Sequence, residues 1–268
     1  MESRPLVTVV VPTRNAARTV ARCLAAVRAQ TYPHVELVVV DNASTDETLA
    51  IAREYADRAV TRGPERCAQR NHGWRIGSGE FVVFLDADMV PTPGVVAEAV
   101  KALRGDPGLG ALVIPETAFG VGFLARCREL EKRLYLGDPR VEAARVFPRA
   151  VLEQVGGYNE DLTAFEDWEL ADRVRAAGYR TGRTTSVVMH DEGRIRLRDA
   201  FAKKRYYGRW LSTYRGTTSR PLGRPALLSQ PGQIIRVPHR FAGLVVLKTA
   251  EWSGLALGAY QSRRVTRP

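Results

Sequence analysis

Three short, mainly apolar runs in the first third of the chain constrain the fold more than any other feature of the sequence. The runs are Val7–Val11, Val35–Val40 and Phe81–Leu85. Runs of this kind, with little polar alternation, are typical of strands that are buried on both faces. Segments with the apolar spacing of helices lie between them, so strand and helix alternate. This alternation predicts βαβ units, a parallel sheet and right-handed crossovers, and therefore an α/β fold.

Local signals predict where several of these elements begin and end. Pro12 is expected to stop the first strand, and Asn15 to cap the helix that follows. Ser44–Glu47 has the form of a capping box, which predicts the start of a second helix. Thr184–Met189 is predicted to be the last strand of the domain, with His190 directly after its end.

The charge of the chain is distributed unevenly. The net charge is +11, yet the first 190 residues contain 24 Lys and Arg against 25 Asp and Glu, whereas the residues after His190 contain 16 against 4. We therefore expect a near-neutral domain over residues 1–192 and a basic, helical C-terminal extension over residues 193–268. A basic extension indicates an anionic partner, such as phospholipid, a phosphorylated acceptor or nucleic acid.

The extension contains a basic, aromatic stretch, Arg194–Arg224, and a mostly apolar stretch, Phe241–Tyr260. Lys248 and Glu251 interrupt the apolar stretch, and charges within a membrane span are costly, so a spanning helix is disfavoured. Two interpretations stay open: a helix packed against the rest of the protein, or a helix lying on an anionic membrane surface. Contacts within a homo-oligomer are also open.

The cellular compartment is inferred from the cysteines and the N-terminus. The three cysteines are far apart in the sequence and have neither disulfide-framework nor metal-site spacing. The N-terminus leads directly into a strand, without the pattern of a signal peptide. We expect a reduced, cytoplasmic protein, peripheral at the inner face of the cell membrane if the extension binds lipid.

Acidic residues follow two of the predicted strands, where ligands bind in open α/β sheets. Asp41 ends the second run, and Asp86 and Asp88, on either side of Ala87, follow the third. Carboxylate oxygens suit Mg²⁺ or Mn²⁺ held together with substrate phosphates. Aspartates that only shape a turn are common, and this alternative interpretation applies to Asp41 in particular. The Glu166-Asp167 pair is likewise explained by helix capping alone.

Four stretches stand out by their order and spacing: Val9-Val10-Val11-Pro12-Thr13-Arg14-Asn15, Val38-Val39-Val40-Asp41-Asn42-Ala43-Ser44-Thr45-Asp46-Glu47-Thr48, Arg70-Asn71-His72-Gly73 through Phe84-Leu85-Asp86-Ala87-Asp88, and Phe165-Glu166-Asp167-Trp168-Glu169-Leu170. Taken together, they resemble the family-2 glycosyltransferases with the GT-A fold over residues 6 to 192. The resemblance implies a Rossmann-like, mixed but mainly parallel central sheet flanked by helices. It also implies an inverting transfer of a sugar from a nucleotide-sugar, with UDP as the expected nucleotide.

The resemblance implies a role for each matching residue. The donor nucleotide-sugar would be bound by Pro12, Thr13, Asp41, Arg70, Asp86, Ala87 and Asp88. Within that set, Asp41 would meet the base, Asp86 the ribose and Asp88 a divalent metal, Mn²⁺ or Mg²⁺. Asp167 would be the catalytic base and His190 a further metal ligand. The acceptor would be a hydroxyl group of a lipid-linked or cell-envelope glycan.

Two other functions are compatible with parts of the sequence. A sugar-phosphate nucleotidyltransferase shares the α/β layout, but it is expected to have a glycine-rich loop after the first strand, and Pro12–Ala16 contains no glycine. A non-enzymatic nucleic-acid-binding protein would use the basic, aromatic stretch Arg194–Trp210. A nucleic-acid partner is the less favoured interpretation of that stretch.

Overall fold

The computed structural model describes residues 4–139, 141–217 and 231–265, with side chains as far as residue 262. These residues form two compact units. The first unit comprises Met1–Pro115, Ala143–Glu160 and Glu166–His190, and the second comprises Glu116–Glu142, Asp161–Phe165 and Asp191–Pro268. The predicted division at residue 192 stays a prediction, because the second unit also includes residues earlier in the chain.

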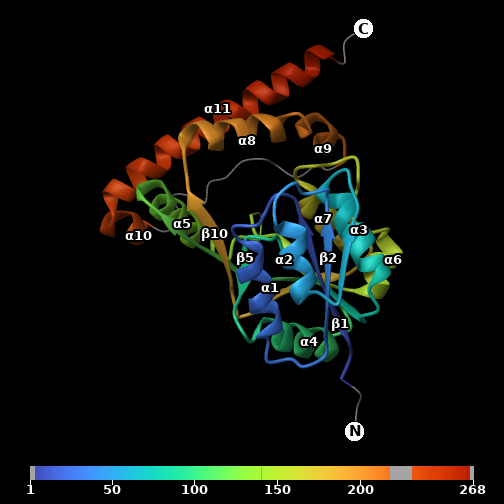
Figure 1. Ribbon diagram of the computed structural model, residues 1–268. Helices are drawn as coiled ribbons and strands as arrows, with labels where there is room; N and C mark the ends of the chain where they lie inside the picture. The colour runs from blue at the N-terminus through green and yellow to red at the C-terminus, as the bar shows by residue number, and fades with distance from the viewer. Residues whose placement is uncertain (1–3, 140, 218–230, 266–268) are drawn as a thin grey trace. The chain divides into compact units, whose positions relative to one another are not determined.

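Strands and helices alternate through most of the chain (Figure 1). The strands are β1 (Val7–Thr13), β2 (Val35–Asp41), β3 (Arg58–Thr61), β4 (Phe81–Phe84), β5 (Met89–Pro91), β6 (Leu109–Val113), β7 (Glu116–Val121), β8 (Ala144–Pro148), β9 (Arg180–Arg183) and β10 (Val188–Arg194). The helices are α1 (Val20–Arg28), α2 (Thr48–Tyr55), α3 (Arg66–Ile76), α4 (Val95–Gly105), α5 (Phe123–Tyr135), α6 (Arg149–Val155), α7 (Glu166–Ala176), α8 (Leu197–Gly208), α9 (Leu211–Thr217), α10 (Pro231–Arg236) and α11 (Pro238–Val265).

The first unit is built on a seven-stranded sheet with the order β3-β2-β1-β4-β8-β6-β9. The pairs β1–β2, β1–β4, β2–β3 and β6–β9 are parallel, whereas β8 is antiparallel to both β4 and β6. A mixed, mainly parallel sheet was expected, and the structure confirms it. The chain adds β2 and β3 on one side of β1 and β4 on the other, so the strand order reverses between β1 and β4. Ligands of open α/β sheets bind at such a reversal, outside the carboxyl ends of the strands.

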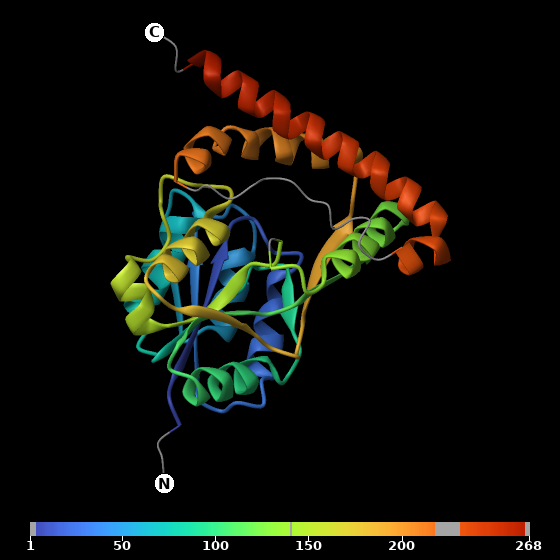
Figure 2. The same cartoon turned by 180° about the vertical axis from the view of Figure 1, so that it is seen from behind.

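Helices cover both faces of this sheet, which Figures 1 and 2 show from opposite sides. Alternate residues of β1 and β4 point to opposite faces: Val9 and Val83 join one core cluster, Val10 and Val82 the other. The first cluster also contains side chains of α1, α2 and α4, and the second contains side chains of α3, α6 and α7. Strands buried on both faces favour apolar side chains at most positions, which explains the mainly apolar runs in the sequence.

Two of the expected element boundaries are wrong. Pro12 does not stop β1, which continues to Thr13 beside β2. The pairing of β1 with β4 ends at Val10, so Pro12 has a paired strand on one side only, where a residue without an N–H group is tolerated. Asn15 does not cap α1, which begins at Val20. Its backbone has a φ of 47°, and its side chain instead accepts a hydrogen bond from Thr45 N at 2.9 Å.

Two further boundaries also differ from expectation. The stretch Ser44–Glu47 forms no capping box, because α2 begins at Thr48 without a side-chain cap at Glu47. Asp46 Oδ1 accepts the hydrogen bond from Thr48 N at 3.1 Å instead. The last strand begins at Val188, not Thr184, and continues to Arg194, so His190 lies within β10 and is paired with Met89 of β5.

The second unit contains α5, β7 and the helices α8 to α11, and α11 packs against α5 and α8. A small core cluster joins Cys127, Leu130 and Leu134 of α5 to Leu244 of α11. Lys248 and Glu251 lie on the packed side of α11, where both are buried. The predicted packing of the 241–260 helix is therefore found within this unit. In the described parts of the chain, no helix has the length and apolar character required to cross a membrane.

Candidate functional site

The residues expected to bind the donor lie at the carboxyl ends of neighbouring strands of the first unit. Thr13 ends β1, Asp41 ends β2, and the two are paired in register. Asp86 and Asp88 follow β4, which lies on the other side of β1. Three segments far apart in the sequence thus meet beside the reversal of strand order.

The Asp41 carboxylate is fully buried, and its hydrogen-bond partners also lie at this edge of the sheet. Its Oδ1 accepts hydrogen bonds from Thr13 Oγ1 at 2.8 Å and from Ser44 Oγ at 2.5 Å, and its Oδ2 accepts one from Ser44 N at 2.7 Å. Asp41 therefore fixes the turn after β2. Gln69 of α3 fixes the same two strand ends, because its Nε2 donates to Thr13 O and Val40 O at 2.9 and 2.5 Å.

Arg70 of α3 is the cation around which the acidic residues gather. Its side chain is 1% exposed, and its two terminal nitrogens contact three carboxylates. One nitrogen donates to Asp86 Oδ1 at 2.7 Å, and the other donates to Glu166 Oε1 at 3.2 Å and Asp167 Oδ1 at 3.1 Å. The fixed fork of an arginine suits such multiple pairing. Arg70 thus links the turn after β4 directly to the start of α7.

These ion pairs and the burial of the site shift the pKa values of its acidic residues. Burial disfavours the charged form of Asp86, but the guanidinium groups of Arg70, Arg145 and Arg66 outweigh burial and hold the pKa of this carboxyl well below its usual range. Burial, reinforced by the charge of Asp167, raises the pKa of Glu166. Asp86 therefore stays ionised at neutral pH, ready to accept hydrogen bonds from a ligand.

The two carboxylate oxygens of Asp167 differ in their hydrogen bonding. Oδ1 accepts hydrogen bonds from Arg70 and from the Tyr158 hydroxyl, both at 3.1 Å. Oδ2 accepts a hydrogen bond from no residue in the described parts of the chain, and the side chain is 21% exposed. Burial and the charge of Asp167 raise the pKa of Tyr158, so its hydroxyl stays protonated and donates. One oxygen fixes the carboxylate, and the other is available to a ligand.

Asn71, next to Arg70 on α3, holds Tyr158 in position. Asn71 Nδ2 donates to Tyr158 O and Asn71 Oδ1 accepts from Tyr158 N, both at 2.8 Å. Gly157, with a φ of 74°, lies so close to Asn71 that a side chain there would collide with Asn71 Oδ1. The tight turn before Tyr158 therefore requires glycine.

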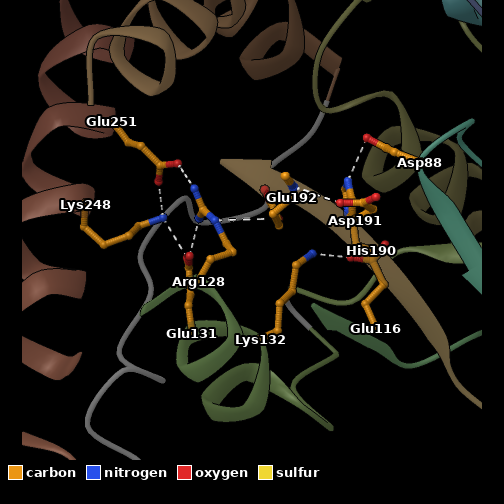
Figure 3. Close-up of polar contacts among 11 residues, drawn as sticks. Asp88, Glu116, Arg128, Glu131, Lys132, His190, Asp191, Glu192, Lys248 and Glu251 are labelled. Carbon is orange, nitrogen blue, oxygen red and sulfur yellow. Dashed lines mark hydrogen bonds and ion pairs between the residues drawn. The ribbon is translucent and has the colours of Figure 1, made fainter. Parts of the chain in front are cut away.

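Asp88 and His190 form the part of the site that suits a metal ion. His190 Nε2 lies 3.0 Å from Asp88 Oδ2, as Figure 3 shows. Asp88 Oδ1 is buried and has no hydrogen-bond partner, although a buried carboxylate oxygen normally has one. An oxygen and an imidazole nitrogen together suit Mn²⁺, so these two residues fit a divalent cation. No group of three or more His, Cys, Asp and Glu side chains that could hold a metal occurs among the described residues, so the remaining ligands would come from elsewhere.

The structure brings together most of the residues expected from the sequence. Asp86, Arg70 and Asp167 are in direct contact, Asp88 contacts His190, and Thr13 contacts Asp41. Pro12 is buried in β1 and Ala87 between the two aspartates. Sequence reasoning missed Tyr158, Gln69 and Arg145. A Gly-Gly pair such as Gly156-Gly157 is typical of a turn, but nothing in the sequence indicates that this turn reaches Asp167.

Two solved structures of enzymes that were determined with a nucleotide or nucleotide-sugar and Mn²⁺ resemble this chain. A mannosyltransferase from Pyrobaculum calidifontis, in complex with GDP-Man and Mn²⁺, matches with a TM-score of 0.67 and 24% identity over 99% of this chain and 89% of that chain. Glucosyl-3-phosphoglycerate synthase from Mycobacterium tuberculosis, in complex with Mn²⁺ and UDP, matches with a TM-score of 0.54 and 21% identity over 82% and 83%. At these identities the likeness establishes the fold alone, and it confirms the expected GT-A architecture.

Sequence comparison identifies the family. The pre-mycofactocin glycosyltransferase of Mycobacterium tuberculosis is 31% identical over 223 residues, which are 75% of this chain and 46% of that protein, so the chain spans about half the length of this relative. The family model described as "Glycosyl transferase family 2" matches residues 8–155, more than half of the chain. That span includes Asp41, Arg70, Asp86 and Asp88 and ends before Asp167. The chain belongs to glycosyl transferase family 2.

Proposed function

We propose that this protein is a metal-dependent, inverting glycosyltransferase. It would move a sugar from a nucleoside-diphosphate sugar, UDP in the first instance, to a hydroxyl group of a lipid-linked or cell-envelope glycan. The observation that carries the proposal is the contact of one buried guanidinium, Arg70, with both Asp86 and Asp167. The acid proposed to bind the donor and the acid proposed to act as base thus share one cation, each bonded to a different terminal nitrogen.

Each residue of the strand edge has a role in binding the donor. Pro12, Thr13 and Asp41 would line the base pocket, and Asp86 would accept hydrogen bonds from the ribose. Arg70 is almost fully buried, so it would act on the nucleotide through Asp86, by holding that carboxylate ionised and in place. Asp88 and His190 would hold the metal ion, whose remaining ligands would be the diphosphate oxygens of the donor.

Asp167 would take the proton of the acceptor. The acceptor oxygen attacks the anomeric carbon and forms the new glycosidic bond, while the bond from that carbon to the diphosphate breaks and its electron pair leaves with the diphosphate. The acceptor proton passes to the Oδ2 atom of Asp167, the oxygen that accepts no hydrogen bond in the described structure. Arg70 and Tyr158 keep Oδ1 fixed during this transfer. A bound divalent cation supplies Lewis-acid stabilisation of the charge that develops on the leaving diphosphate.

The names and ligands of similar proteins support the proposal without deciding the nucleotide. One solved neighbour binds GDP-Man and another UDP, and both contain Mn²⁺. The basic extension favours an anionic acceptor or an acceptor carried on an anionic surface.

A donor screen tests the proposal. UDP- and GDP-sugars are incubated with the full chain and Mn²⁺, Mg²⁺ or EDTA, and the released nucleoside diphosphate is measured. We expect release from UDP-sugars with Mn²⁺, its loss with EDTA, and its loss in the Asp88→Asn variant. Release that is unaffected by EDTA and by this substitution would refute the metal-dependent mechanism. Turnover of GDP-sugars alone would correct the nucleotide. No turnover, together with salt-sensitive binding to oligonucleotides, would favour a nucleic-acid-binding function.

A further inference from the structure

Helix α11 of the second unit has two different faces. Its inner face, which packs on α5 and α8, contains Lys248 and Glu251, and both side chains are buried. Gly254 and Gly258 also lie on this face, so close to the α8 backbone that a Cβ atom at either position would collide with a carbonyl oxygen of Phe201 or Arg205. In Figures 1 and 2, α5 and α8 lie on the same side of α11.

Ion pairs neutralise the two charges on the inner face. Lys248 Nζ lies 2.7 Å from Glu131 Oε1 of α5 and 2.5 Å from Glu251 Oε2 (Figure 3). Arg128 of α5 pairs with both of these glutamates and lies 3.7 Å from Glu192. The two charges that interrupt the apolar stretch in the sequence thus lie in a buried network, and neither is available to the other side of the helix.

Over residues 242–261, the outer face of α11 is exposed and uncharged. Val245, Val246, Trp252, Leu257 and Tyr260 are between 36% and 52% exposed. At 3.6 residues per turn they fall within an arc of about 140° around the helix axis, so they share one face. The other exposed residues of 242–261 are Ala242, Thr249, Ser253, Ala256 and Gln261. From the first to the last of these aromatic and aliphatic side chains the face is about 20 Å long, at 1.5 Å per residue.

All of the net charge of the protein belongs to the unit that presents this face. The second unit contains 21 Lys and Arg against 10 Asp and Glu, a net charge of +11, whereas the first unit contains 19 of each. Lys203 and Arg205 of α8 are exposed, as are Arg209, directly after α8, and Arg236, just before α11 begins. The face is thus apolar and uncharged, and the unit that presents it is strongly basic.

We propose that the outer face of α11 docks on the surface of a bilayer that contains anionic phospholipid. The helix would lie in the plane of the interface, with Val246 and Trp252 among the acyl chains and the basic residues of the unit against the headgroups. Apolar area and charge attraction together are what bind an amphipathic helix to an anionic membrane, and tryptophan prefers the boundary between lipid and water. A second copy of the chain is the weaker alternative occupant, because two units with a charge of +11 repel one another.

Vesicle flotation with the full-length protein tests this surface. The probes are vesicles of equimolar phosphatidylglycerol and phosphatidylcholine, and vesicles of phosphatidylcholine alone. We expect the protein to float with the anionic vesicles and not with the neutral ones, and to dissociate as the salt concentration rises. The Val246→Asp and Trp252→Asp variants are each expected to bind the anionic vesicles at least about tenfold more weakly.

Leu136→Asp is the matched control. Leu136 belongs to the same unit, is 41% exposed against 51% for Trp252, lies outside α11, and undergoes the same change of charge. It is expected to reduce binding by less than about threefold. Because Val246 and Trp252 are half-exposed, both variants are expected to keep the thermal melting curve of the parent protein.

Three outcomes would overturn the proposal. The Trp252→Asp variant could bind anionic vesicles as strongly as the parent protein, or the parent protein could bind neutral and anionic vesicles equally. The third is that the parent protein binds no vesicles but sediments as a dimer, which the Trp252→Asp substitution dissociates. The test uses no nucleotide-sugar, so it succeeds or fails independently of the proposed transfer.

Discussion

Replacing Asp167 with asparagine separates the two tasks that the structure gives to this side chain. Its Oδ1 accepts hydrogen bonds from Arg70 and Tyr158, and an amide oxygen in the same place still accepts both. Its Oδ2, the proposed proton acceptor, becomes an amide nitrogen that cannot take a proton. Asp167→Asn therefore keeps the shape of the site and removes its base.

The expected magnitudes differ between turnover, stability and donor binding. General-base catalysis contributes roughly 10²–10⁴-fold, so the barrier is expected to rise by about 3–5 kcal/mol. Arg70 keeps Asp86 and Glu166 as partners, so it is not left unpaired, and the free energy of unfolding is expected to fall by only about 1 kcal/mol. Asp41, Asp86 and Asp88 are unchanged, so donor affinity is expected to stay within about threefold.

The assay measures release of nucleoside diphosphate from the donor with water as the acceptor, and calorimetry measures binding of the nucleoside diphosphate. Asp172→Asn is the control, because Asp172 is on the same helix, is also 21% exposed and is also ion-paired, to Arg175 at 2.8 Å. We expect it to keep normal turnover. Turnover of Asp167→Asn within about fivefold of the parent protein would refute the assignment of the base.

Three further predictions concern other parts of the structure. His190→Ala is expected to weaken Mn²⁺ binding by about 10–100-fold in calorimetry with UDP present, and unchanged affinity would exclude it as a ligand. Hydrogen bonds from Ser186 and Thr185 lower the pKa of Glu98 to about 2. The ionised Glu98 therefore stabilises the folded protein above the usual carboxyl pKa range, and this contribution is lost as the pH falls toward 2. In denaturant unfolding, the Glu98→Gln variant is expected to be about 1 kcal/mol less stable than the parent protein at pH 7, and the difference is expected to shrink on acidification. Lys248→Met removes one of the cations that pair with the buried Glu131 and Glu251, and it is expected to cost about 3 kcal/mol in denaturant unfolding. The control Lys203→Met, on an exposed side chain, is expected to cost less than about 0.5 kcal/mol.

The acidic residues of the site could be named from the sequence, but not their partners. Asp41 and Asp86 were identified because each follows a strand that is buried on both faces, and the carboxyl ends of parallel strands share one edge of a sheet. Arg70 was expected at the nucleotide, and its almost complete burial between three carboxylates was not foreseen. Its partners lie 16, 96 and 97 residues away along the chain, and no local pattern reports contacts of that kind.

Element boundaries failed where a long-range contact replaced a local signal. The signal at Asn15 is that of a helix cap, yet its side chain binds the backbone of Thr45 in the next loop. Pro12 is a strand breaker in isolation, but it is tolerated in β1 because β4 is no longer paired at that point. In each case the tertiary neighbour decided the outcome.

The sequence by itself determined the class of the fold and the charge of the C-terminal extension. Mainly apolar runs that alternate with segments of helical spacing permit little other than a covered, mainly parallel sheet, because such a sheet buries both faces of its strands. The two charges within 241–260 could not be placed from the sequence, since a helix can present any of its sides. Only the tertiary structure assigned Lys248 and Glu251 to the packed side, where Arg128 and Glu131 neutralise them, and left the opposite side of α11 apolar and exposed. The physical reason is that an unpaired buried charge is too costly, so the face that carries the charges is the face that meets its ion partners.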